Sequence, residues 1–153
     1  MLIERVVQSL NQHRVQYTLV GGYAVALHGA VRGTVDIDFV ISLNLRSYRQ
    51  AEKALNSIGL KSRLPVSADD VFNFREEYIE KRNLIAWSFT NPDNPLEIVD
   101  IIITEDVKQM KSVVKTFNGT KIKIAAIDDL IKMKKKSGRK QDIEDINALE
   151  KLR

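Results

Sequence analysis

Residues 17–41 read YTLVGGYAVALHGAVRGTVDIDFVI. This stretch opens with a short apolar run, passes through a Gly-Gly pair and a helix-like segment, and closes with an apolar run that carries two aspartates. Glycines between a strand and a helix let the backbone turn tightly and approach a bound anion. The stretch therefore predicts a strand over 17–20, a Gly-Gly turn, a short helix over 23–28 and a second strand over 35–41.

Asp36 and Asp38 are the acids of the second predicted strand. Because side chains alternate along a strand, both carboxylates are expected on one face, roughly 6–7 Å apart at their Cα atoms. Burial and mutual repulsion disfavour two ionised carboxylates on an apolar strand, and a bound cation offsets that cost. The alternatives are a solvated strand end or aspartates that pair with Arg or Lys, so this dyad alone leaves metal binding open.

Asp100 is a lone aspartate in a second apolar run, LEIVDIII at 96–103. If that run forms a strand beside 35–41, Asp100 reaches the dyad. Three carboxylates from neighbouring strands suit a hard cation such as Mg²⁺, which takes further ligands from water and phosphate. The alternative is a buried ion-pair partner. Glu97 is expected to face away from Asp100, since the two positions differ by an odd number.

The rest of the chain alternates helical and strand patterns. Apolar spacing predicts helices over 3–13, 46–58, 106–113, 127–137 and 140–152, and strands over 84–89, 96–103 and 120–125, the first two forming a hairpin. The last helix is expected to bury Ile143, Ile146 and Leu149. This alternation predicts an α/β (α+β) fold with a mixed sheet flanked by helices. Its 153 residues favour one domain, with a core over 1–125 and a C-terminal helical element over 126–153.

Composition narrows the function classes. With no cysteine, the chain has neither disulfides nor thiolate metal sites, and no run approaches the ~20 apolar residues of a membrane span. We expect a cytoplasmic protein without a membrane partner. The net charge is +4, and basic residues gather between Lys132 and Lys140, where six of nine are Lys or Arg. This cluster is either a solvated helix face or a contact for triphosphate or RNA.

The segments LVGGYAVALHG (19–29) and RGTVDID (32–38) resemble the signature of the polymerase-beta-type nucleotidyltransferase superfamily. That signature is a Gly-Gly or Gly-Ser pair, a spacer, Asp-x-Asp, and a third acid on a later strand, which Asp100 matches. The resemblance implies a nucleotidyltransferase fold with a C-terminal helical hairpin. It implies that Asp36 and Asp38 bind two Mg²⁺ ions (or Mn²⁺) with a nucleoside triphosphate, and that Asp100 helps to activate the attacking hydroxyl. The implied nucleotide-binding residues near this motif are Gly21, Gly22, Arg32 and Thr34.

The C-terminal segments DLIKMK (129–134) and GRKQDIEDI (138–146) resemble the Leu-x-x-x-Lys and Arg-x-x-Asp element of small stand-alone members, including the AbiEii-like group. By this likeness Lys134, with Arg139, meets the triphosphate, and Asp142 holds Lys134 or the base side of the pocket. Gly22 stands where the toxin group usually has Ser.

The resemblance implies transfer of a nucleoside monophosphate to a hydroxyl of RNA, tRNA, a protein or a small molecule. It also leaves room for a toxin–antitoxin system with a cognate partner protein. One alternative is an antibiotic acceptor, as in aminoglycoside and lincosamide nucleotidyltransferases. Another is a non-catalytic regulator or antitoxin of the same fold, which binds a nucleotide or a partner without transferring anything.

Overall fold

In the computed structural model the chain is described over residues 1–30, 33 and 36–153. Within these residues seven strands form one sheet in the order β3-β4-β5-β2-β1-β7-β6. At its centre, β1 (Tyr17–Val20) pairs antiparallel with β2 (Ile37–Ile41) and parallel with β7 (Thr120–Ala125), while β2 pairs parallel with β5 (Asn94–Ile102). The predicted α+β class with a mixed sheet is therefore confirmed.

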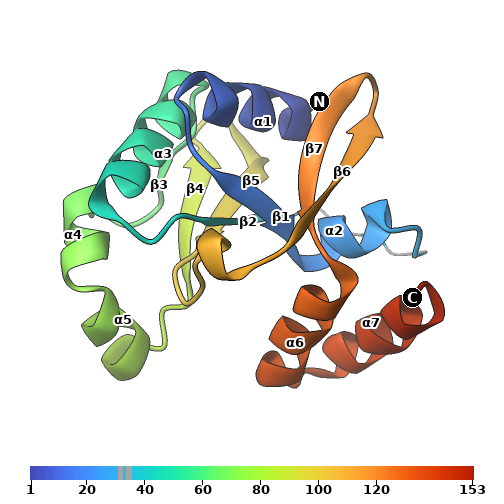
Figure 1. Cartoon of the computed structure of the whole chain (residues 1–153). Helices are drawn as coiled ribbons and strands as arrows, with labels where there is room; N and C mark the ends of the chain where they lie inside the picture. The colour runs from blue at the N-terminus through green and yellow to red at the C-terminus, as the bar shows by residue number, and fades with distance from the viewer. Residues whose placement is uncertain (31–32, 34–35) are drawn as a thin grey trace.

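Two helices, α1 (Leu2–Gln12) and α3 (Leu45–Ser57), lie together along one side of the sheet (Figure 1). Both bury apolar side chains at helical spacing, as the sequence predicts. The side chain of Asn44 caps α3 by accepting a hydrogen bond from the Ser47 N–H. Ser9 of α1 donates a hydrogen bond of 2.7 Å to the Ala54 carbonyl of α3, which holds the two helices in contact.

The apolar core fixes the register of the central strands. Ile37, Phe39 and Ile41 alternate along β2 and are all buried. In the sheet, Phe39 lies opposite Leu19 of β1 and beside Ile101 of β5, and both partners are also buried. A one-residue slip would exchange the two faces of a strand, so this burial also determines where the polar side chains point.

The predicted hairpin over 84–103 is confirmed: β4 (Ala86–Asn91) pairs antiparallel with β5. A short edge strand, β3 (Lys61–Ser62), pairs with β4 and was not predicted. Between β3 and β4 lie the helices α4 (Ala68–Asn73) and α5 (Arg75–Arg82).

The predicted helix over 106–113 is wrong. A short 3₁₀ turn, η1 (Val107–Gln109), occupies part of that range, and the edge strand β6 (Ser112–Phe117) begins inside it. β6 pairs antiparallel with β7, where Val113 faces Ile124. Its β-branched residues favour a strand, and the ladder with β7 supplies backbone hydrogen bonds that outweigh the helical spacing.

The C-terminal hairpin has the predicted bounds. α6 (Ile127–Ser137) ends at Gly138, which has a φ of +66°, and α7 (Lys140–Lys151) follows at once. Figure 1 shows the pair on the opposite side of the molecule from α1 and α3. No helix in the described residues is both long and apolar enough to span a bilayer.

The predicted stripe on α7 is wrong at Ile143, which is 56% exposed. The helix instead buries Asp142, Asp145 and Leu149, which share a face at i, i+3 and i+7. Two acids replace apolar residues on this face because they pair with a lysine of α6, as described below.

Candidate functional site

Gly21 joins β1 to the short helix α2 (Gly21–Leu27), which begins two residues before the predicted start. Its φ is +69°, a conformation that L side chains rarely adopt. A Cβ there would lie 2.1 Å from Asp38 Oδ2, since the preceding Val20 is the register partner of Asp38. Gly22 is buried behind it. The Gly-Gly turn therefore brings the backbone directly against the Asp38 carboxylate.

Asp38 and Asp100 are direct partners on the adjacent parallel strands β2 and β5, as the sequence predicts for neighbouring strands. Burial, together with the negative charges of Asp100 and Asp36, raises the pKa of Asp38 to about 7, while Lys134 acts in the opposite direction. Asp100 Oδ1 is buried and has no hydrogen-bond partner within the described residues. Glu97 faces elsewhere and pairs with Arg5.

Asp36 does not lie within the strand. β2 begins at Ile37, and Asp36 is exposed just before it, so the prediction that both acids belong to this strand is wrong for Asp36. The predicted start of that strand at Val35 falls outside the described residues. Asp36 is still near enough to raise the pKa of Asp38. Across residues 1–30, 33 and 36–153, no three His, Asp or Glu side chains are arranged as a metal cluster.

A cleft of about 310 Å³ opens beside Asp38. One wall comes from the sheet and the turn that follows β1, with Gly21, Asp38 and Ile102, and a second wall comes from the C-terminal hairpin. The residues that the hairpin contributes to the lining are Leu130, Met133, Lys134, Lys136, Ser137, Arg139 and Asp142. The lining thus combines the Asp38 carboxylate with the basic residues Lys134, Lys136 and Arg139 of the hairpin, and it includes apolar side chains from both parts.

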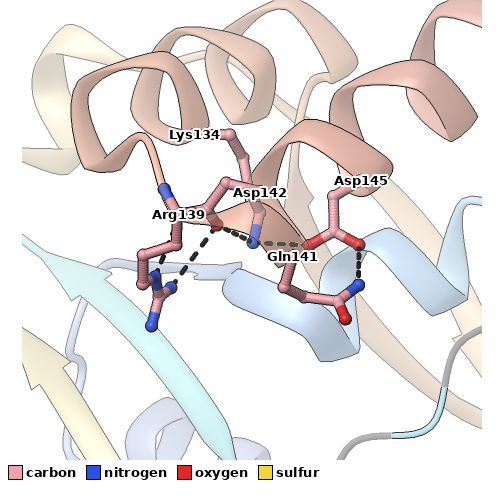
Figure 2. Close-up of polar contacts among 5 residues, drawn as sticks. All are labelled: Lys134, Arg139, Gln141, Asp142 and Asp145. Atoms are coloured by element: carbon pink, nitrogen blue, oxygen red, sulfur yellow. Dashed lines mark hydrogen bonds and ion pairs between the residues drawn. The ribbon is translucent and has the colours of Figure 1, made fainter.

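Lys134 projects from α6 into a group of polar side chains on α7. Figure 2 shows it between Asp142 and Asp145, with Arg139 beyond Asp142 and Gln141 beside Asp145. Its Nζ lies 3.2 Å from Asp142 Oδ1 and 2.9 Å from Asp145 Oδ2. Lys134 is only 7% exposed, whereas the other basic residues of the cluster over 132–140 are exposed. The solvated-face interpretation therefore fits most of that cluster, and Lys134 is the exception.

Asp142 also anchors the start of α7. It accepts hydrogen bonds from the backbone N–H of Arg139 at 3.1 Å and from its guanidinium Nε at 3.0 Å. Although burial acts in the opposite direction, these hydrogen bonds hold the pKa of Asp142 below its usual range. The Arg139 guanidinium has a raised pKa, mainly through Asp142 and to a smaller extent through Asp38. Arg139 therefore lies within electrostatic reach of Asp38.

Some predicted site residues are not among those that the structure shows lining the cleft. Arg32 and Thr34 lie outside the described residues. Asp100 lies beside Asp38 in the sheet but is not part of the cleft lining. His28, which was expected to be a helix-end residue, has its Nε2 2.8 Å from the Ala125 carbonyl oxygen, a contact between α2 and the end of β7.

Sequence reasoning missed Asp145 and Gln141. The available signal was the spacing of Asp142, Asp145 and Leu149. These three residues define one helical face, just as the predicted apolar stripe of Ile143, Ile146 and Leu149 does. A helical stripe that contains two acids predicts an exposed face, unless a buried cation is known to pack against it. That cation, Lys134, lies on a different helix, and only the packing of α6 on α7 reveals it.

No protein-family profile matches the chain, and no curated protein matches it. Solved structures do resemble it. The antibiotic-resistance factor ANT(2'')-Ia has a TM-score of 0.65 at 12% identity, over 97% of this chain and 80% of that one. The lincosamide antibiotic adenylyltransferase LnuA has a TM-score of 0.64 at 15% identity, over 99% and 96%. An antigenic nucleotidyltransferase-like protein from Paracoccidioides brasiliensis has a TM-score of 0.60 at 18% identity, over 96% and 73%. Because the chain matches these structures over nearly its whole length, it has the nucleotidyltransferase fold.

Proposed function

We propose that this protein transfers a nucleoside monophosphate from a nucleoside triphosphate to a hydroxyl acceptor. The observation that carries the proposal is Asp38, which is in register with Asp100, lies against the turn at Gly21 and lines a cleft together with Lys134 and Arg139. A carboxylate and basic side chains that line the same cleft match the needs of a triphosphate with a divalent metal.

The acidic pair fits a divalent cation. Mg²⁺ in proteins is typically held by one or two carboxylates together with water and substrate phosphate oxygens. The raised pKa of Asp38 and the unpartnered, buried Asp100 Oδ1 show two acids whose negative charge is poorly compensated by the described residues. We propose that Asp38 and Asp100, joined by Asp36, hold the two Mg²⁺ ions. Bound there, the metal would neutralise phosphate charge and polarise the reacting oxygens.

The chain's own residues would supply the remaining steps. Gly21 would let the phosphate groups of the nucleotide approach Asp38, because a side chain at position 21 would fill the space beside that carboxylate. Lys134 and Arg139 would stabilise the negative charge that develops on the leaving pyrophosphate. Asp100 would favour loss of the proton from the attacking hydroxyl. The apolar side chains Ile102, Leu130 and Met133 would exclude water and contact the nucleoside.

The test is incubation with each radiolabelled nucleoside triphosphate, Mg²⁺ and acceptors of four kinds: tRNA, total RNA, protein, and antibiotics. Antibiotics belong in the panel because neighbours of this fold are solved with lincomycin and with adenylyl-2''-tobramycin. We expect label transfer that Asp38→Asn reduces at least ~100-fold, the size of effect typical when a group acting in the transition state is removed. An unchanged rate in Asp38→Asn would reject the proposal.

The non-catalytic alternative has its own result in the same assay. Metal-dependent nucleotide binding without transfer to any acceptor would identify a binding protein of this fold, such as a regulator or antitoxin. The proposal includes a cytoplasmic setting and a cognate partner protein, and co-purification from the source cell tests both.

A further inference from the structure

Lys134 is a buried ammonium that contacts carboxylates at unequal distances. Its Nζ lies 2.9 Å from Asp145 Oδ2 and 3.2 Å from Asp142 Oδ1. All three side chains are nearly inaccessible, at 8%, 4% and 1% exposure. In a buried environment an ion pair fixes the positions of its side chains more strongly than on a surface, because water cannot replace either partner.

The carboxylate of Asp142 accepts one hydrogen bond from Lys134, and its other contacts are with Arg139. Both of its oxygens contact Arg139: Oδ2 accepts from the guanidinium Nε and from the backbone N–H, and Oδ1 lies 3.4 Å from Nη2. The backbone contact belongs to a capping box at the start of α7, so Asp142 also satisfies an amide that the helix itself leaves unpaired. The position of Asp142 is therefore set by Arg139 and the helix end.

The carboxylate of Asp145 is fixed by its own helix. Gln141 Nε2 donates to Asp145 Oδ1 at 3.1 Å, four residues earlier on α7. This contact turns Oδ2 towards Lys134, as Figure 2 shows. Asp145 thus presents one oxygen to the ammonium while the other is held in place.

We propose that Asp145 is the positioning residue for Lys134, aiming its ammonium at the phosphates of the bound nucleotide, while Asp142 serves Arg139. This inference rests on the proposed function. An ammonium has three N–H donors. One of them donates to Asp142 Oδ1, the charge pairs with Asp145 Oδ2 at 2.9 Å, and Lys134 is among the residues that line the cleft. A lysine stem is flexible, so without a fixed carboxylate the charge would not keep that direction.

The experiment measures affinity for a non-hydrolysable triphosphate analogue, for the matching diphosphate and for the nucleoside, each with Mg²⁺. The analogue is the one of the four bases that the wild-type protein binds best. The variants are Asp145→Asn, Asp145→Glu, Asp142→Asn and Lys134→Met. Glu144→Gln is the matched control, because it removes one charge from the same turn of α7 at an exposed position.

We expect Asp145→Asn to weaken triphosphate binding about tenfold, which corresponds to about 1.4 kcal/mol, with nucleoside binding unchanged. Asp145→Glu should recover part of the loss because it restores the charge. The double variant Lys134→Met with Asp145→Asn should bind no worse than Lys134→Met, because residues that act as one unit are not additive. A purely structural role would lower the melting temperature without changing the preference for triphosphate over nucleoside.

Three results separate the outcomes. If Asp145→Asn binds triphosphate like the wild type while Lys134→Met does not, Asp145 does not position Lys134 and only this inference fails. If the wild-type protein binds no triphosphate, the proposed function fails and takes this inference with it. Should Asp145→Asn not fold, Gln141→Ala replaces it, since that change frees the Asp145 carboxylate without removing its charge. A smaller loss of about twofold to threefold is then expected, and none would contradict the inference.

Discussion

The backbone at Gly21 combines a φ of +69° with a position 2.1 Å from Asp38 Oδ2 for any added Cβ. Either feature alone would favour glycine, and together they make it a requirement of the site. The strain belongs to the local backbone, while the collision arises from the sheet register that sets Val20 opposite Asp38. The two costs can be separated by substitution.

Gly21→Ala is expected to destabilise the protein by more than the ~1–2 kcal/mol of an alanine at positive φ, because Asp38 must also move. It should also weaken nucleotide binding. Gly119→Ala is the matched control: it has a φ of +80° but nothing within 4 Å of its added Cβ. Urea unfolding of both variants gives the comparison. Equal losses, with nucleotide binding retained in Gly21→Ala, would show that the contact with Asp38 is unimportant.

The pKa of Asp38 predicts a pH dependence. Because its folded-state pKa, about 7, lies well above the ordinary pKa of an aspartate, the folded protein binds a proton that the unfolded chain releases. The contribution of Asp38 to stability is therefore fully present below about pH 4 and is lost as the pH rises through 7. Without divalent cations, the melting temperature should fall over that window more steeply in the wild type than in Asp38→Asn. Asp93→Asn, at an exposed turn, is the control.

At the scale of elements, the parallel pairing of β2 with β5 brings Asp38 and Asp100 together. Like charges directly opposite on neighbouring strands are destabilising by roughly 0.2–1 kcal/mol. The chain therefore carries a local cost in its central sheet, at the place where the proposed function needs negative charge.

Asp100→Asn is expected to stabilise the metal-free protein by up to about 1 kcal/mol, since it removes one charge and supplies an amide donor to Asp38. The same change should abolish nucleotidyl transfer. Chemical denaturation without metal and the labelled-nucleotide assay measure the two effects. A loss of stability in Asp100→Asn would mean that Asp100 has a compensating partner, and the proposed metal site would then lack its basis.

At the scale of the whole molecule, the cleft joins two parts that are far apart in the chain: the sheet wall at Gly21, Asp38 and Ile102, and the hairpin wall of α6 and α7. A ligand that contacts both walls stabilises the folded state by linkage, because the unfolded chain has no cleft. The predicted division into a core over 1–125 and a helical element over 126–153 stays a prediction, and it places the cleft at that boundary.

Mg²⁺ with a non-hydrolysable triphosphate at about 100 times its dissociation constant should add roughly 2.7 kcal/mol of stability. For a chain of this size we expect a rise in melting temperature of roughly 5–10 °C, seen by scanning calorimetry. The Asp38→Asn variant with Mg²⁺ and the same triphosphate, and the wild type with the nucleoside alone, should both show a smaller shift. A full shift in Asp38→Asn would place the nucleotide somewhere other than this cleft.

The sequence by itself determined most local structure. The bounds of β1, β7 and α6 agree with the predicted ranges, because strong apolar periodicity and glycine stops act over a few residues. It also singled out Gly21, Asp38 and Asp100, since a glycine pair and isolated acids in apolar runs stand out in any context. The prediction from sequence failed at 106–113, because the pairing of β6 with β7 outweighed the helical spacing of the apolar residues there.

Only the tertiary structure decided which polar residues meet. Asp36 lies just outside the strand in which it was predicted, and Asp145 is buried where the apolar pattern predicted Ile143 to be buried. The physical reason is that burial of a charge depends on its partner, and the partners of Asp38 and Asp145 lie on other elements, β5 and α6. Periodicity describes one element at a time, whereas an ion pair needs two.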